Sequence, residues 1–367
     1  MIPKARGAFC FSLLTVCLLL AGCGGAVSPQ SIGAALAGPC GAPLGYSYLG
    51  WSPDGGSISF TTWVGTQSAM ITVMGPDGAD QRRLTDGSRE DFGPVWSPDG
   101  QTIAFVSISN QGADIYRIDA DGRHLTRLTR GPGPDLSPAW SPGSGDRIAF
   151  LSGVDSGSLD LYLMDGNGSN QVQLTHDGDL GTAPAWSPDG RWIAFGTANQ
   201  QSPGIYLIRP DGTGEHPLDI DLELSSLAWS PDGERLAYVS AGMGYYGISL
   251  VSVDGRDHAD LTTARAIVSL PAWSPDGKAI YFDARQAGKA DIYRIDLAGP
   301  GPIHQTALTG GPGENFNPAV SPDGRTVIFL STRGGAAADI YRMDADGSNQ
   351  ARLTANPANQ RCLKWPF

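Results

Sequence analysis

The chain of 367 residues contains 50 glycines and 27 prolines, and only 17% of its residues are charged. Glycine and proline together average about 12% of protein residues, so their share of about a fifth here excludes helical bundles and coiled coils and favours short strands joined by tight turns. The formal net charge of −12 argues against nucleic acid as a partner, because duplex binders need clustered Lys and Arg.

The amino terminus predicts an export signal. Lys4 and Arg6 precede an apolar stretch over 8–20, and small residues then lead to Cys23. A basic segment, a short apolar segment and small residues before a cleavage point are typical of a secretory signal peptide, and the string Leu-Ala-Gly-Cys resembles the bacterial lipobox. We therefore expect 1–22 to be a lipoprotein signal peptide and Cys23 to carry the lipid. The alternative is an ordinary signal peptide with a chance cysteine.

Processing at this point changes the charge and leaves two cysteines. Removal of the two basic residues in the signal brings the net charge from −12 to −14. Residues 23–43 lack charge and periodicity and are predicted to form a flexible tether from the lipidated cysteine. Cys40 and Cys362 remain as an isolated pair, which in an exported protein suggests a disulfide. Two free thiols are the alternative.

A motif recurs seven times along the rest of the chain. The string Trp-Ser-Pro-Asp-Gly, or a degenerate form of it, recurs at spacings of 43 to 47 residues, starting at Trp51, Trp96, Trp140, Trp186, Trp229, Trp273 and Val320. Proline presets φ, Asp forms turns and Gly accepts positive φ, so each copy predicts a hairpin turn. Seven copies at this regularity indicate a repeat architecture.

Each unit has the same internal order. After the turn comes an apolar strand such as 103–105, then a segment such as 114–116, an Asp-Gly turn, and a short strand that ends in Leu-Thr, as at 128–129. Both faces of the apolar strand are non-polar, as expected for a sheet packed between two similar sheets. Four strands per unit predict an all-β fold, a seven-bladed β-propeller of four-stranded antiparallel blades over 44–367. We expect the recurrent Trp to pack between blades.

These residues resemble the TolB-like, WD40-like propeller repeat (PD40), whose recurrent text is PAWSPDGxxIAFxS, then DIYxMDxDG, then LT. The resemblance covers roughly residues 44–365. It implies the propeller fold and a protein-binding module, and together with Cys23 it predicts a lipoprotein member of the family.

Ring closure gives a further expectation for the two ends of the folded region. Eleven residues separate Thr354 from Trp365, the distance that elsewhere separates Leu-Thr from the next motif. Residues 361–365 are therefore expected to add a strand or to cover the first blade. Because the ends of a ring are neighbours, Cys40 and Cys362 would lie close together.

Signatures of catalysis are scarce in the sequence. It contains no Gly-x-Ser-x-Gly elbow, Walker loop or HExxH motif. The five histidines fall near the last strand of a unit or its flanking turns, which is the outer rim of a propeller. We therefore expect no catalytic residue, no cofactor and no metal ligand set.

Acidic residues recur just before the first strand of five units, at Asp91, Asp135, Asp179, Glu223 and Glu314. In a propeller these positions lie around one mouth of the channel, where five carboxylates would attract a cation or a basic peptide. Solvated loop acids are the alternative, and Arg265 at the equivalent place in the sixth unit interrupts the series.

The sequence thus favours a scaffold that is exported by a bacterium and anchored in the membrane by its N-terminal lipid, on the periplasmic or extracellular face. We expect a monomer that binds an envelope protein or peptide and is not an enzyme. The alternative is an enzyme or binding protein for a glycan or small ligand at the channel mouth, with or without a divalent metal.

Overall fold

The computed structural model of the chain describes residues 46–64, 68–110, 112–153, 158–176, 178, 180–197, 203–218, 226–242, 245–262, 267–286, 288–297, 304–335 and 337–355. Within these ranges the only regular elements are 28 strands, four for each of the seven sequence units. No helix in this part of the chain has the length and apolar character needed to cross a membrane.

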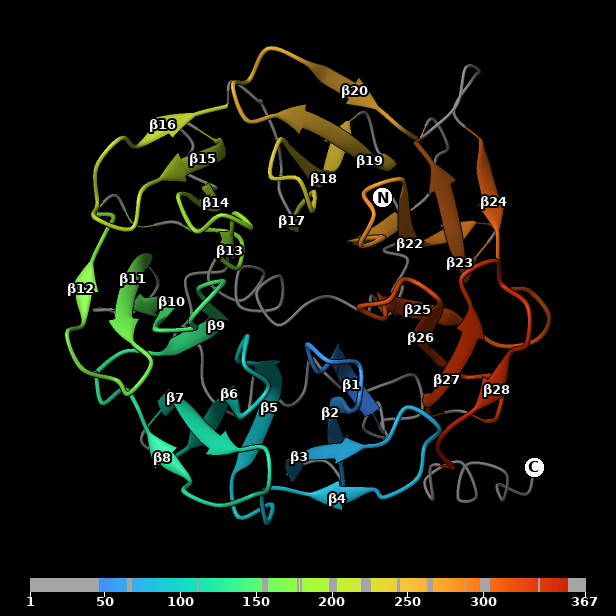
Figure 1. Ribbon diagram of the computed structural model, residues 1–367, viewed down its shortest axis with the longest axis horizontal. Coiled ribbons are helices and arrows are strands. Elements are labelled where there is room, and N and C mark those ends of the chain that lie inside the picture. Colours follow the sequence, from blue (N-terminus) through green and yellow to red (C-terminus); the bar gives the residue numbers. More distant parts are fainter. Residues whose placement is uncertain are drawn as a thin grey trace, which may run out of the picture.

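The first strand of each unit lies nearest the centre of the ring (Figure 1). These inner strands are β1 (Tyr46–Trp51), β5 (Glu90–Trp96), β9 (Asp135–Trp140), β13 (Ala185–Trp186), β17 (Leu227–Trp229), β21 (Ile267–Trp273) and β25 (Asn315–Val320). The second strands are β2 (Ile58–Trp63), β6 (Thr102–Ser109), β10 (Arg147–Gly153), β14 (Ile193–Thr197), β18 (Arg235–Gly242), β22 (Ala279–Gln286) and β26 (Thr326–Ser331).

The third and fourth strands complete each blade toward the rim. The third strands are β3 (Ala69–Met74), β7 (Gly112–Asp119), β11 (Leu159–Asp165), β15 (Gly204–Ile208), β19 (Tyr245–Ser252), β23 (Lys289–Asp296) and β27 (Asp339–Asp344). The fourth are β4 (Arg82–Arg83), β8 (Thr126–Arg127), β12 (Val172–Gln173), β16 (His216–Pro217), β20 (His258–Asp260), β24 (Gln305–Ala307) and β28 (Ala351–Arg352).

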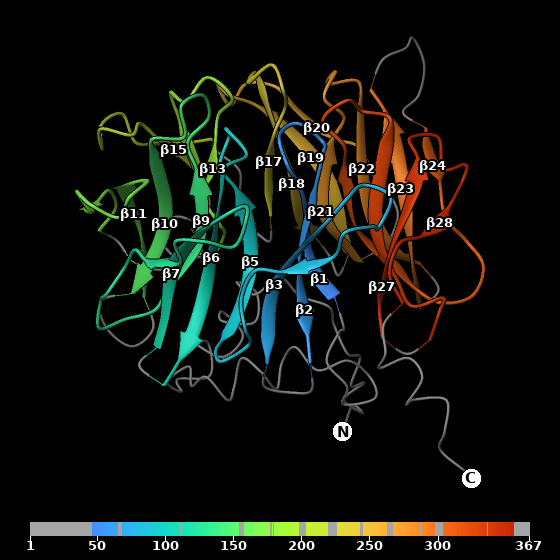
Figure 2. The ribbon, with the colours of Figure 1, turned by 60° about the horizontal axis from the view of Figure 1, so that its bottom comes forward.

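The strands pair in sequence order within each blade, and all these pairings are antiparallel. Five blades are separate four-stranded sheets, while the first two are joined by a single parallel bridge between Ala69 of β3 and Glu90 of β5. The predicted seven-bladed propeller is therefore confirmed. Figure 2 shows the strands running between the two faces of the ring.

The repeated turn is built from its own side chains. In the second blade the Ser97 hydroxyl donates to Asp99 Oδ1 at 2.5 Å, the Gln101 amide donates to the same oxygen at 3.0 Å, and Gly100 has φ 69°. These hydrogen bonds, with that of the Ser97 hydroxyl first, lower the pKa of Asp99. The recurrent Asp therefore shapes the turn between the first and second strands, as the motif predicts.

The recurrent Trp residues connect neighbouring blades, as expected. In five of the joints the indole Nε1 donates at 2.9–3.2 Å to the carbonyl oxygen just before the motif of the preceding blade, from Trp51 to Ala319, Trp140 to Val95, Trp186 to Ala139, Trp229 to Ala185 and Trp273 to Ala228. The seventh copy has Val320 in place of Trp. Packing between blades is thus confirmed as the role of this position.

The ring closes between the last blade and the first through packed side chains. Phe60 and Met74 of the first blade share a buried cluster with Ile328 and Leu330 of the last. All four strands of each blade come from one continuous stretch of chain, so in the described residues closure depends on this apolar contact and on the Trp51 hydrogen bond. The predicted closing elements, 361–365, Cys40 and Cys362, lie outside the described residues, as do Cys23, the signal peptide and the tether.

Candidate functional site

The inner strands begin at one mouth of the channel, and the three predicted acids that the structure describes, Asp91, Asp135 and Glu314, lie at or next to the first residue of such a strand. Asp91 is the second residue of β5 and Asp135 is the first of β9. Both stand five residues before the motif Trp, and both pair with a serine of the second strand, Asp91 with Ser107 and Asp135 with Ser152. Glu314 stands six residues before its motif start, one position earlier than the two aspartates stand before theirs. In the last blade the residue equivalent to Asp91 and Asp135 is therefore Asn315, which pairs with Ser331.

Burial distinguishes these acids from loop carboxylates. Asp91 is 1% exposed and Asp135 is 2% exposed. Burial raises the pKa of both carboxyl groups. A nearby hydroxyl opposes this effect in each case, that of Ser107 for Asp91 and that of Ser152 for Asp135. The two aspartates therefore lie inside strands at the joints between blades, and not in solvated loops. Asp179 and Glu223 lie outside the described residues, as does Arg265.

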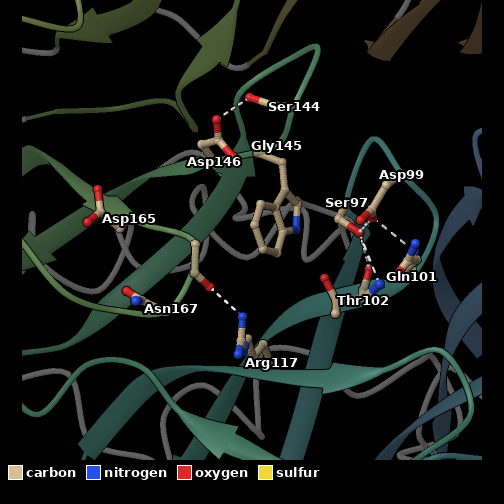
Figure 3. A pocket seen from close by; sticks show the side chains of 12 residues that line it. Ser97, Asp99, Gln101, Thr102, Arg117, Ser144, Gly145, Asp146, Asp165 and Asn167 are labelled. Atoms are coloured by element: carbon tan, nitrogen blue, oxygen red, sulfur yellow. Dashed lines mark hydrogen bonds between the residues drawn. The ribbon is translucent and has the colours of Figure 1, made fainter.

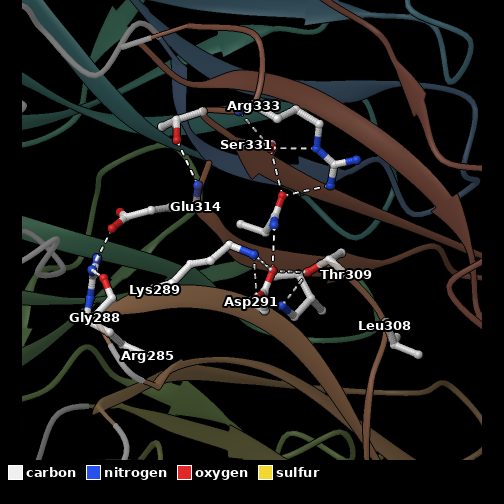
Figure 4. Close-up of polar contacts among 12 residues, drawn as sticks. Arg285, Gly288, Lys289, Asp291, Leu308, Thr309, Glu314, Ser331 and Arg333 are labelled. Carbon is white, nitrogen blue, oxygen red and sulfur yellow. Dashed lines mark hydrogen bonds and ion pairs between the residues drawn. The ribbon is translucent and has the colours of Figure 1, made fainter. Parts of the chain in front are cut away.

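The joint between the sixth and seventh blades shows a completed version of this arrangement (Figure 4). Asn315 donates from Nδ2 to Asp291 Oδ1 at 2.8 Å, and its Oδ1 accepts from Ser331 at 2.7 Å and from Arg333 at 2.8 Å. Asp291 also accepts from Thr309 at 3.0 Å. Buried polar groups here satisfy one another across two blades.

Acids at this joint also have basic partners. Arg285 of β22 contacts Glu314 at 2.5 Å, with side chains 28% and 38% exposed, and Lys289 lies 2.8 Å from Asp291. At the joint between the second and third blades, Arg127 contacts Asp114 at 2.8 Å. These joints therefore contain a cation near their carboxylates.

The joint between the first and second blades has the same acids and different partners. Glu90 stands at the position of Glu314, but strand register places Trp63 where the sixth blade has Arg285. Asp91 stands at the position of Asn315, but Met70 replaces Asp291. Ala69, the first residue of β3, pairs with Trp63 of β2 and also bridges to Glu90. Apolar side chains thus replace the two groups, Arg285 and Asp291, that contact these positions at the joint between the sixth and seventh blades.

Polar atoms at this joint are consequently unmatched. Among the described residues, six buried side-chain atoms lack a hydrogen-bond partner. Four of them lie at the mouth end of this joint, Arg89 Nε, Glu90 Oε2, Asp91 Oδ1 and Ser107 Oγ, and a fifth, Trp96 Nε1, lies at the opposite end of β5. Burial alone raises the pKa of Glu90. Arg89 lies over the Tyr116 ring, 4.5 Å from its centroid, and donates to its hydroxyl at 3.1 Å. Its charge only partly offsets the effect of burial on the Asp91 pKa.

Sequence reasoning missed Glu90 and Arg285. The signal was available, since Glu90 and Glu314 both stand six residues before their motif starts. Strict alignment of the repeats would have grouped these two glutamates and placed Asp91 with Asp135 and Asn315.

The histidines lie toward the rim, as their positions in the repeat predict. His216 is in β16 and His258 is in β20, both fourth strands, and His124 is in the turn before β8. In the ranges that the structure describes, no group of three or more His, Cys, Asp or Glu residues is arranged to hold a metal ion.

Seven four-stranded blades around a channel define a β-propeller, here with an acidic joint at one mouth. Segments 64–221, 158–304 and 221–365 match the family model described as TolB beta propeller domain. The chain therefore belongs to the TolB beta propeller domain family.

Individual relatives agree with this assignment. The Tol-Pal system protein TolB of Anaeromyxobacter dehalogenans is 32% identical over 107 residues, which cover 29% of this chain and 23% of that protein. The matched segments span less than a third of the length of such curated relatives.

Solved structures share the fold at low identity. A puromycin-hydrolyzing peptidase of Mycobacterium tuberculosis matches with a TM-score of 0.69 at 16% identity, over 91% of this chain and 56% of that one. An oligogalacturonate lyase of Vibrio parahaemolyticus matches with a TM-score of 0.63 at 16% identity, over 81% and 89%. At these identities the likeness concerns the fold.

Proposed function

We propose that this TolB-like propeller is a non-enzymatic scaffold that binds a basic segment of an envelope protein at the channel mouth between its first two blades. The observation that carries the proposal is the difference between two equivalent joints. Glu314 has Arg285 as its partner, whereas Glu90, with Asp91 beside it, has Trp63 and Met70 in the corresponding places.

A cation from a partner protein would supply the hydrogen-bonded positive charge that Glu90 Oε2 lacks, because Arg89 at this joint lies over the Tyr116 ring. A carboxylate removed from water is stabilised strongly by a hydrogen-bonded positive charge. A Lys or Arg side chain from a partner would take the place that Arg285 has beside Glu314. Because burial raises the pKa of both Glu90 and Asp91, binding of a cation would lower these pKa values and release any proton held there.

Long-range charge supports the same class of partner. The formal net charge of −12 attracts basic segments and repels acidic ones. Export, lipidation at Cys23 and a position at the periplasmic or extracellular face belong to the proposal on the strength of the lipobox. They would confine the monomeric propeller to the membrane surface where an envelope partner is found.

Calorimetric titration with a short arginine-rich peptide tests the binding class. The wild type is compared with a Glu90→Gln/Asp91→Asn variant, and Asp135→Asn serves as the matched control because it alters an equivalent buried acid at a joint that contains Arg127. We expect saturable binding that weakens with added salt and is lost in the double variant alone. Equal binding by all three proteins would overturn the proposed site. Stoichiometric metal in the purified protein without any protein partner would favour the enzymatic alternative.

A further inference from the structure

A pocket of about 300 Å³ lies between the second and third blades, on the face that carries the Ser-Pro-Asp-Gly turns. Residues of both turns line it, including Asp99 and Asp146, together with Trp140. β5 spans seven residues from the mouth to this face, so at about 3.3 Å per residue the pocket is roughly 20 Å from the acidic joint. It is therefore separate from the site proposed above.

The third blade departs from the repeat at this place. Its turn reads Trp-Ser-Pro-Gly-Ser-Gly-Asp, and eight residues lead from Trp140 to Ile148 where seven lead from Trp96 to Ile103. Gly166 stands where the second and seventh blades have Ala120 and Ala345.

Gly166 is required by the indole beside it. A Cβ at this position would lie 2.8 Å from Cζ3 of Trp140 and 3.3 Å from the Gly145 carbonyl oxygen. Real Cβ contacts are not this short, so any larger residue would displace the indole. This glycine therefore lets the Trp140 ring pack closely against the third-blade turn at the edge of the pocket.

The lining combines one aromatic ring with polar groups. Figure 3 shows the carboxylates of Asp99, Asp146 and Asp165 on different sides of the pocket, with Arg117 along its edge. Arg117 donates from Nη1 to the Gly166 carbonyl at 3.0 Å, which fixes it across the joint. Three carboxylates against one guanidinium give the pocket a net negative charge.

Amide groups add further hydrogen-bonding capacity. Gln101 is exposed at the pocket. Asn167 uses its Oδ1 to accept from the amide and hydroxyl of Ser169, which leaves the Nδ2 group as a donor for a ligand. Carboxylates accept hydrogen bonds from hydroxyl and ammonium groups, amides both donate and accept, and the indole face packs against C–H groups.

We propose that this pocket binds a single ring of an amino sugar within a glycan. Sugars present hydroxyl groups at their edges and C–H groups on their faces, which matches polar side chains around an indole. The net negative charge favours a ring that bears an ammonium group over an acidic ring. The volume is at the lower end of the 300–1,000 Å³ range of small-molecule pockets, and this suits one ring.

The test is an NMR titration of the full chain, following the indole N–H signal of Trp140, which is assigned from a Trp140→Phe sample. Glucosamine, N-acetylglucosamine and galacturonate are the probes. We expect saturable shifts with a millimolar Kd for glucosamine, weaker binding of N-acetylglucosamine and none of galacturonate. Galacturonate binding as tight as that of glucosamine, or no saturable shift with any probe, would overturn the proposal.

Two variants link the binding to the pocket. Gly166→Ala should weaken glucosamine binding by at least about tenfold, a change of about 1.4 kcal/mol, while Ala345→Gly at the equivalent place of the last blade should leave it unchanged. Gln101→Ala, which removes only an exposed side chain, should weaken binding without lowering the unfolding temperature. Unaltered affinity in both Gly166→Ala and Gln101→Ala would refute the assignment of the site.

Discussion

Replacing Asp91 with Asn should stabilise the propeller. The Asp91 side chain is 1% exposed and its Oδ1 has no hydrogen-bond partner, and a buried unsatisfied polar group costs about 1–3 kcal/mol, more when it is charged. Asn is the residue that the last blade uses at the equivalent position, and its amide can hydrogen-bond to the neighbouring hydroxyls. We expect the free energy of unfolding at pH 7 to rise by about 1–2 kcal/mol.

The gain in stability from Asp91→Asn should depend on pH. Burial raises the pKa of Asp91 in the folded protein, so the folded state binds more protons than the unfolded state, whose Asp pKa is about 3.9. Wild-type stability therefore falls as the pH rises from the unfolded pKa through the folded pKa. The advantage of Asp91→Asn should be small at pH 4 and larger at pH 7.

Denaturant unfolding at several pH values measures this difference. Asn315→Asp is the matched control, because it places a second carboxylate next to Asp291, which Asn315 contacts at 2.8 Å. That change should destabilise the protein by about 2–4 kcal/mol at pH 7. A loss of stability in Asp91→Asn, or a gain that is the same at pH 4 and pH 7, would show that the buried Asp91 carboxylate does not destabilise the fold.

Three further predictions concern the ring and its closure. Leu330→Ala, at the buried seam between the last and first blades, should lower the free energy of unfolding by about 2–5 kcal/mol in denaturant unfolding. In the same experiment Leu125→Ala, at a 45% exposed position, should change it by less than about 0.5 kcal/mol. Trp186→Phe removes a 3.1 Å hydrogen bond between blades and should cost about 1–3 kcal/mol by leaving a carbonyl unpaired, and an unchanged unfolding midpoint would contradict this role. Thiol titration of the unreduced mature protein should find no free thiol at Cys40 and Cys362, and a count of two would exclude the disulfide.

The architecture could be predicted from the sequence because the residues that shape each blade recur in nearly every copy of the motif. Where the motif has Trp, its indole contacts the equivalent position of the preceding copy, as at Trp140 and Val95, and the Asp of a regular turn accepts hydrogen bonds from residues two positions away, as at Asp99. The turn is therefore predicted by each copy on its own, and the Trp contact follows from the stacking of successive copies. Spacing then fixed the number of blades.

The chemistry of the mouth could not be predicted in the same way. A difference of one residue decides which side of a strand a side chain takes, and this separates Glu314 from the Asp91 position. Whether an acid has a partner depends on the neighbouring blade, where Trp63 replaces Arg285. The pocket at Trp140 depends on Gly166, whose effect appears only when two strands are placed together.

Site-specific photocrosslinking in intact cells tests whether an envelope protein binds at the mouth between the first two blades. A photoreactive residue at Val64, which is 50% exposed just after β2 at the mouth of the first blade, is compared with one at Val172, which is 55% exposed on a fourth strand at the rim. We expect a photoreactive residue at position 64 to capture an envelope protein and one at position 172 not to do so, and we expect Glu90→Gln/Asp91→Asn to abolish the capture. Equal capture from both positions, or capture from Val64 that survives the double substitution, would contradict it.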